Sequence, residues 1–300
     1  MPTMIKRSFR FWQSLGIHVV RNHYYQPVPD TRTLKDDLWV VPAEMPGIDF
    51  RDHEQLTLLS RFKEKYGREY GAFPRTATSS ASDYYVNNGR YESVDGEILY
   101  GMVRELKPKL MLEFGAGFST LAAAQAFRLN LAEDPGYVYE FVSVDPEPDA
   151  VIHKTVPGIT RLEKGLAQET PPSRFMELRA NDILFIDSSH VLKIGSDVHY
   201  LFLHILPRLN PGVIVHIHDI FLPAEYPKDW IMGHLRFYNE QYLLQAFLTY
   251  NSAFEILWAG AYMHLKHPAQ LRDAIKSYDC NCHCPGSVWI RRKGSLHLSP

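Results

Sequence analysis

Acidic and imidazole side chains follow two apolar runs in the second half of the sequence. The run ILFID ends in Asp187, with His190 three residues further on. The run VIVHIHD contains His216 and ends in His218 and Asp219. Burying so many ionisable groups without partners is costly, so their clustering indicates a site. A histidine with its ordinary pKa, about 6.5, can take a proton from a hydroxyl near neutral pH. The pattern predicts proton transfer or metal-ion chemistry.

A glycine-containing turn follows an earlier apolar run, LMLEF, and reads EFGAGFST from Glu113 to Thr120. Two glycines let the backbone turn sharply and let a ligand approach closely, and the following helix presents free N–H groups. A dinucleotide-binding turn would have a third glycine where Thr120 stands. It would also lack a carboxylate such as Glu113, which suits a ligand with an ammonium group and no phosphate. The turn therefore favours S-adenosylmethionine (SAM), with expected contacts at Glu113, Gly115, Gly117 and Ser119.

Two polar residues further along could complete a nucleoside site. Asp145 ends the next apolar run, 28 residues after Gly117, where a carboxylate can accept both ribose hydroxyls. The alternative is that Asp145 only caps a following helix. Beside the glycine turn, the ribose interpretation is favoured. Gln168, after the third predicted strand, stands where an adenine amine could be held.

The elements that must position these residues alternate from Ser93 onward. Apolar runs predict strands at 110–114, 139–144, 158–162, 183–186, 213–217, 254–258 and 287–290. Helix-like spacing lies between most of them, at 96–106, 120–129, 194–206 and 240–249. This alternation predicts an α/β fold, a parallel sheet with helices on both faces. Ligands bind such sheets at the carboxyl ends of the strands, where the residues above are found.

The remaining segments predict a cap and two insertions. Residues 1–90 are rich in Tyr, Pro and turn residues, with helical spacing only at 55–66, and are expected to cover the SAM-binding domain of residues 91–300. A lid is expected at about 220–240, and a hairpin at about 279–286. Candidates to line an acceptor pocket, or merely to pack, are His23, Tyr24, Tyr25, Tyr226, Trp230, Arg236, Asn239 and Glu240. The hairpin holds Cys280, Cys282 and Cys284, interpreted as reduced thiols, with a structural zinc as the alternative.

Composition limits the partners. The 300 residues carry a net charge of −2, with 45% hydrophobic and 22% charged residues, as in a globular protein with a sizeable core. No strong field favours nucleic acid or an anionic membrane, although a local patch could survive this average. No apolar run approaches the roughly 18–20 residues that span a bilayer. No secretory signal or disulfide framework is indicated, so a cytoplasmic protein is expected, with homo-oligomerisation left open.

Two blocks of sequence resemble a known family. The stretch SVDGEILYGMVRELKPKLMLEFGAGFSTL is similar to the cofactor-site region of the catechol O-methyltransferase-like branch of class I SAM-dependent methyltransferases. The block from DILFIDSSH to HIHDIF resembles the family-24 methyltransferases and the cephalosporin-hydroxylase-like proteins related to them. The resemblance covers about residues 91–221 and extends to the final SVWIRRK. It implies a Rossmann-like sheet of seven strands with the last antiparallel, and it places Asp95 near the methionine end of SAM.

The resemblance also implies a metal-assisted reaction. Positions matching Asp187, His218 and Asp219 supply divalent-metal ligands in the similar O-methyltransferases, and His190 matches the place of their catalytic base. Those enzymes use carboxylates and amides, whereas His218 offers an imidazole. Because Mg²⁺ prefers oxygen donors, the metal is left open among Mg, Mn and Fe. The expected catalytic residues are His190, Asp187 and His218.

Three hypotheses follow for the activity. The leading one is SAM-dependent O-methylation of a small molecule or sugar. The second is a metal-dependent oxygenase or hydroxylase, in which His218 pairs with His190 or His216, and with Asp187 or Asp219. The third is a non-catalytic interaction protein on the same fold, against which the intact glycine turn argues.

Overall fold

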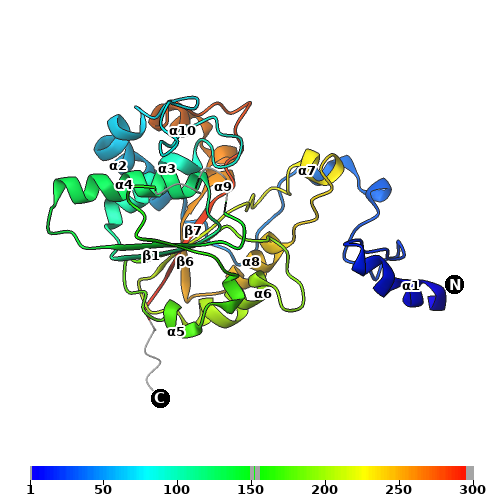
Figure 1. Cartoon of the computed structure of the whole chain (residues 1–300). Helices are drawn as coiled ribbons and strands as arrows, with labels where there is room; N and C mark the ends of the chain where they lie inside the picture. Colours follow the sequence, from blue (N-terminus) through cyan, green and yellow to red (C-terminus); the bar gives the residue numbers. More distant parts are fainter. Residues whose placement is uncertain (1, 149–151, 153–155, 295–300) are drawn as a thin grey trace, which may run out of the picture. The chain divides into compact units, whose positions relative to one another are not determined.

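A seven-stranded mixed sheet organises the computed structural model, which describes residues 2–148, 152 and 156–294 (Figure 1). The strand order is β3-β2-β1-β4-β5-β7-β6, and only β7 runs antiparallel to its neighbours. The strands are β1 Leu110–Phe114, β2 Glu140–Val144, β3 Arg161–Glu163, β4 Ile183–Ile186, β5 Ile214–Ile217, β6 Phe254–Ala259 and β7 Val288–Arg292. The predicted Rossmann-like α/β fold with an antiparallel last strand is confirmed.

Helices cover both faces of this sheet, and each face has its own apolar core (Figure 1). One face carries α2 Asp52–Tyr70, α3 Asp95–Leu106, α4 Phe118–Glu133, α9 Gly260–Lys266 and α10 Pro268–Ala274. The other carries α5 Pro172–Phe175, α6 Asp197–Tyr200 and α8 Glu240–Leu248, with π and 3-10 turns continuing α6 to Arg208. A 3-10 turn also forms at Ala167–Glu169. No helix in the described ranges is long and apolar enough to cross a membrane.

Predicted and observed boundaries differ where glycines break the regular backbone. β3 begins three residues later than predicted, because Gly158 has φ +105° in the left-handed region. The helix expected from residue 194 begins at Asp197, because Gly195 has φ +73° and the Ser196 hydroxyl caps the first turn by accepting from the His199 N–H. The predicted elements are otherwise found within a few residues of their expected ends.

The chain divides into two compact units. The smaller comprises the first 42 residues with Glu225–Phe237, and it contains α1 Pro2–Ser14, α7 Lys228–Met232 and 3-10 turns at Thr31–Thr33 and Asp36–Trp39. Within it, the Trp39 indole N–H donates to the Tyr226 carbonyl (2.9 Å) and Lys228 pairs with Asp36 (2.7 Å). The larger unit holds the sheet, and the boundary expected near residue 90 lies inside it.

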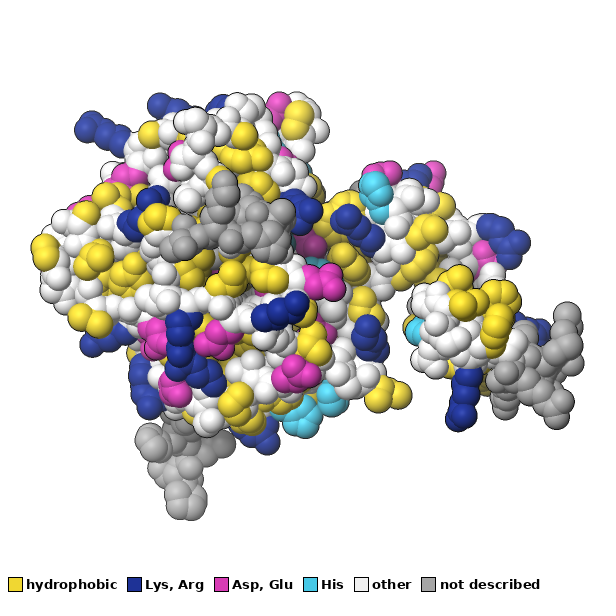
Figure 2. Space-filling model, viewed as in Figure 1, with side chains coloured by type: hydrophobic (Ala, Val, Ile, Leu, Met, Phe, Trp, Pro, Cys, Tyr) yellow, Lys and Arg dark blue, Asp and Glu magenta, His cyan; other side chains and the backbone are white. Residues whose placement is uncertain are grey.

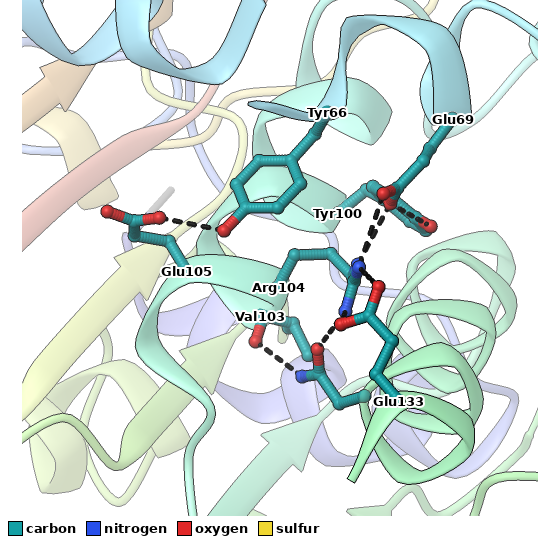
Figure 3. A network of polar contacts seen from close by, with 8 residues as sticks. Tyr66, Glu69, Tyr100, Val103, Arg104, Glu105 and Glu133 are labelled. Carbon is teal, nitrogen blue, oxygen red and sulfur yellow. Dashed lines mark hydrogen bonds and ion pairs between the residues drawn. The ribbon is translucent and has the colours of Figure 1, made fainter. Parts of the chain in front are cut away.

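Residues 43–90 join the larger unit because α2 packs on α3. The Phe62 ring lies 2.5 Å from where a Cβ on Gly101 would stand, so only a glycine permits this approach. The buried Arg104 side chain of α3 pairs with Glu69 of α2 (2.9 Å) and Glu133 of α4 (2.5 Å) (Figure 3). Leaving such a buried charge unpaired costs about 3–5 kcal/mol. The network therefore fixes α3 and α4, whose first turns adjoin the strand ends.

Candidate active site

The glycine turn brings the ends of β1 and β4 together. The Asp187 N–H donates to the Phe114 carbonyl (2.9 Å), and Gly115, with φ +103°, lies directly against the Asp187 backbone. A Cβ on Gly115 would stand 1.9 Å from the Asp187 carbonyl oxygen. A Cβ on Gly117, which begins α4, would meet nothing within 4 Å. A glycine is therefore needed at 115 so that the turn can pack against the Asp187 backbone, whereas Gly117 borders open space.

Asp145 braces this turn from the end of β2. One carboxylate oxygen accepts from the Ala116 N–H (2.8 Å) and the other from the Glu147 N–H (2.7 Å). Each carboxylate oxygen has two lone pairs, so capacity remains for hydroxyl donors. The residue thus holds the loop and presents an acceptor beside it.

A cleft of about 350 Å³ opens beside these strand ends. Four of the residues singled out in the sequence line it: Gly115, Asp145, Gln168 and Asp187. The Gln168 side-chain oxygen is buried and accepts no hydrogen bond from any described residue. A buried acceptor without a partner is costly, so a ligand amine or a water is expected there. Lys193, which the sequence analysis missed, adds a cation to the same wall.

Glu113 and Ser119 lie beneath the cleft rather than in its lining. The fully buried Glu113 carboxylate accepts from the Ser119 hydroxyl (2.8 Å) and the Thr120 hydroxyl (2.7 Å). Burial raises the pKa of Glu113 to about 7, against the opposing effect of hydroxyl donors. Strand alternation explains its direction, because Glu113 shares with Met111 the face covered by α3 and α4. Glu113 thus holds the start of α4, and its expected contact with the SAM ammonium stays a prediction.

Asp95 also serves packing. Its buried carboxylate accepts from the Gly286 N–H (2.9 Å) and from the Ser287 hydroxyl, so it ties the first turn of α3 to the residues before β7. It is not among the residues that line the cleft. The expected contact with the methionine end of SAM is not visible in this arrangement.

A second group of donors adjoins the cleft and shares Asp187 with it. His190 Nε2 lies 3.2 Å from Asp187 Oδ1 and 3.4 Å from Asp219 Oδ2. The three ligand atoms lie within 4.8 Å of one another, and the described part of the chain has no other such group. Two carboxylates and an imidazole at this spacing suit a divalent cation with mixed oxygen and nitrogen preference, such as Mn²⁺ or Fe²⁺.

The start of α8 holds His190 in place. Glu240 Oε2 lies 2.9 Å from His190 Nδ1, and the Asn239 and Glu240 N–H groups both donate to the His190 carbonyl. Asn239 also accepts from the Leu192 N–H (2.6 Å). These contacts support a left-handed backbone at His190, with φ +57°. Of these two residues, both predicted as pocket-lining, Glu240 thus orients the imidazole, as carboxylates do for metal-bound histidines, and Asn239 holds the backbone around His190.

The surrounding charges determine the protonation of His190. Burial disfavours the imidazolium, but hydrogen bonds to Asp187 and Glu240, with the charge of Asp219, outweigh it and raise the pKa of His190 well above its usual value. Without a cation these contacts favour the imidazolium form of His190, in which the ring has no lone pair left to accept a proton. This differs from the sequence-based expectation, which used the ordinary pKa of histidine.

His216 and His218 lie on one side of β5, as their spacing predicts, with their rings stacked 5.7 Å apart. His216 is fully buried against the Phe185 ring at 3.9 Å, and burial lowers its pKa well below the usual value. His218 packs against Tyr91 at 4.8 Å, and its Nε2 lies 3.5 Å from Asp219. His218 was expected as a metal ligand, yet His190 occupies that place in the converging group. His218 borders the group instead.

The remaining candidates lie elsewhere. Tyr226, Trp230 and Arg236 belong to the smaller unit, where Arg236 lies over the Trp230 ring at 5.0 Å. His23, Tyr24 and Tyr25 belong to the same unit, and their rings contact one another at tilted angles. The three cysteines are free thiols, and among described residues they do not converge as a metal group.

Comparisons with known proteins agree with this architecture. Residues 112–220 match a family model described as a methyltransferase domain. An uncharacterized protein of Archaeoglobus fulgidus is 31% identical over 109 residues, 34% of this chain. The aligned region spans about half of that relative, 48% of its length.

Solved structures with a similar trace include two O-methyltransferases. One, from Bacillus cereus and in complex with S-adenosylhomocysteine (SAH), is 11% identical, with 96% of this chain and 100% of that chain covered and a TM-score of 0.39. The other, a TDP-rhamnose 3'-O-methyltransferase of calicheamicin biosynthesis, is 14% identical, with coverage of 86% and 99% and a TM-score of 0.42. The family match falls on the strands and turns that build the cleft, so residues 112–220 carry the methyltransferase domain that this family model describes.

Proposed function

We propose that the protein transfers the methyl group of SAM to a hydroxyl of a small molecule or sugar, with the help of a divalent cation. One observation carries the proposal: Asp187 belongs both to the cleft that Gly115, Asp145 and Gln168 line and to the donor group with His190 and Asp219. A nucleoside site and a cation site thereby share a wall, as methyl transfer to a cation-bound oxygen requires.

The cleft supplies complementary groups for each part of the cofactor. Asp145 can accept from ribose hydroxyls while it holds the Ala116 N–H, and the unpartnered Gln168 oxygen can accept from the adenine amine. Lys193 offers a cation for the carboxylate of the methionine part. Gly117 leaves open space where the ligand must approach the start of α4.

The chain's own residues define what the second group can do. Asp187, His190 and Asp219 would hold the cation, which when bound lowers the pKa of an acceptor hydroxyl and orients it. The Asp187 and Asp219 side chains are 28% and 16% exposed, so they remain within reach of solvent. Glu240 fixes the His190 ring. A bound cation would neutralise the negative charges of Asp187 and Asp219. The electrostatic effect that favours the protonated form of His190 would then be weaker.

The oxygenase alternative has less support from this geometry. It needs two histidines and one carboxylate, whereas the converging group holds two carboxylates and only His190. His216 packs in the core against Phe185. A non-catalytic interaction protein would not account for the unpartnered Gln168 oxygen or for the three converging donor atoms. Titration with SAM distinguishes such a protein from a methyltransferase, because it should bind SAM weakly or not at all.

Asp145→Asn is expected to weaken SAH binding at least about tenfold, because a charge-assisted hydrogen bond to a ribose hydroxyl contributes about 1.5–3 kcal/mol. The asparagine oxygen can still accept from the Ala116 N–H, so the contact that braces the turn is kept, whereas the second contact, with the Glu147 N–H, is lost. Calorimetric titration with SAM and SAH measures the change. Asp273→Asn, at a side chain 71% exposed on α10, is the matched control. Equal SAH affinity in a folded Asp145→Asn variant would contradict the assignment of the ribose site.

A further inference from the structure

Exposed apolar side chains are concentrated near the start of the chain. Among the residues whose side chains the structure describes, 22 large hydrophobic side chains are exposed, and eleven of these fall within residues 11–41, about a tenth of the sequence. They include Phe11 (59%), Leu15 (57%), Tyr24 (82%) and Tyr25 (80%). Scattered exposed apolar residues need no explanation, but a concentration of this kind marks a surface that binds something.

The same segment is basic, in contrast to the rest of the chain. Residues 1–29 contain Lys6, Arg7, Arg10 and Arg21 and no acidic residue before Asp30. Residues 30–300 hold 28 basic and 34 acidic residues. The net charge of −2 is therefore an average over the whole chain, and residues 1–29 form a cationic segment within it. An anionic surface is the complementary partner.

Helix α1 separates these two properties onto opposite sides. At 3.6 residues per turn, the apolar positions 9, 11 and 12 fall on one side of the helix and the basic position 10 on the other. Apolar side chains continue after the helix, with Ile17 and Val20 50% and 45% exposed. In Figure 2, the part of the chain that carries α1 shows hydrophobic side chains at its surface beside Lys and Arg. Helices of this composition lie in the plane of a membrane surface.

We propose that residues 2–25 bind the surface of an anionic phospholipid bilayer, with the apolar side of α1 in the headgroup region and its cations toward lipid phosphates. Tyr24 and Tyr25, whose rings contact each other and the His23 ring at tilted angles, suit the boundary between headgroups and acyl chains. The sequence-based expectation that the protein has no membrane partner used the net charge of the whole chain and the lack of a spanning segment. Binding to a membrane surface depends instead on the local charge and apolar surface of the segment that makes the contact. A second copy of this segment would bring four like charges, so it is the poorer partner.

The test measures co-sedimentation of the full-length protein with vesicles, without SAM or metal, so it does not depend on the proposed methyl transfer. The wild type should bind vesicles of equal parts phosphatidylglycerol and phosphatidylcholine and should bind pure phosphatidylcholine at least tenfold more weakly. Arg10→Gln with Arg21→Gln should weaken binding to the anionic vesicles roughly 30-fold, because each cation near such a surface contributes about a factor of five. Lys63→Gln with Lys65→Gln, on α2, removes the same charge and should bind as the wild type.

A second variant tests the apolar contribution. Phe11→Ser with Leu15→Ser changes two side chains that are more than half exposed, so folding should be retained while vesicle binding falls at least tenfold. Wild-type protein that stays in solution with anionic vesicles, or that binds neutral vesicles equally well, would overturn the proposal. A dimer that is lost in the Phe11→Ser, Leu15→Ser variant while vesicle binding is unchanged would overturn it in favour of contact between copies.

Discussion

Replacing Asp187 by Asn should lower the affinity of the protein for Mn²⁺ at least about 100-fold. Even the loss of a residue that only hydrogen-bonds to a metal ligand typically lowers metal affinity about 10–100-fold. Asp187 is the one residue shared by the cofactor cleft and the donor group, and asparagine keeps its shape without its charge. Titration of Mn²⁺, followed by calorimetry or by the electron paramagnetic resonance of the free ion, measures this. Asp273→Asn again serves as the control.

The same substitution has a second expected effect, which a loss of folding would not produce. In the metal-free protein, the hydrogen bond that the His190 ring donates to Asp187 is the largest of the contributions that raise the pKa of His190. Asp187→Asn should therefore lower the pKa of His190, because its imidazolium loses a carboxylate partner, and NMR titration of the ring can follow it. Unchanged Mn²⁺ affinity together with an unchanged His190 titration would show that the donor group does not act as assigned.

Gly115→Ala is expected to abolish SAH binding and to lower the free energy of unfolding by about 3 kcal/mol or more. The new Cβ would stand 1.9 Å from the Asp187 carbonyl oxygen, and φ +103° is a conformation that alanine avoids. Either the turn or the end of β4 must move, and both line the cleft. Thermal unfolding and SAH titration measure the two effects.

Gly117→Ala provides the matched comparison two residues further on. Its Cβ would meet nothing within 4 Å, and its φ of −163° is extended backbone. The variant should keep its melting temperature while SAH binding weakens, since the methyl group would enter the space at the start of α4 that the ligand is expected to use. Wild-type stability and wild-type SAH affinity in Gly115→Ala would be incompatible with the structure of this turn.

The fold was predictable because its signals are local. Apolar runs such as LMLEF and ILFI alternate with helical spacing, and they form β1 and β4 at the predicted residues. The carboxyl ends of parallel strands meet at one edge of the sheet, so the sequence alone assigns Gly115, Asp145, Gln168 and Asp187 to one region, and they line one cleft.

The parts of the site that could not be predicted depend on longer-range geometry. His190 rather than His218 joins the donor group because Glu240, fifty residues away in the chain, holds its ring, and because its backbone is left-handed. Neither fact has a signature in the sequence near residue 190. The direction of Glu113 had a usable signal, because hydroxyls at 119 and 120 follow six and seven residues later, just beyond the glycine turn, and strand alternation turns Glu113 toward them. The polar loop after β4 can also be recognised in the sequence, but Lys193 within it was not predicted to line the site.

The central claim is that one cleft holds the adenosyl group of SAM beside the Asp187, His190 and Asp219 donors. A crystal structure of the protein soaked with SAH and Mn²⁺ tests it most directly. The account predicts a ribose on Asp145, an adenine amine on Gln168 and an ion bound by the three donors. SAH bound in another part of the molecule, with this cleft and the donor group vacant at saturating ligand, would contradict it.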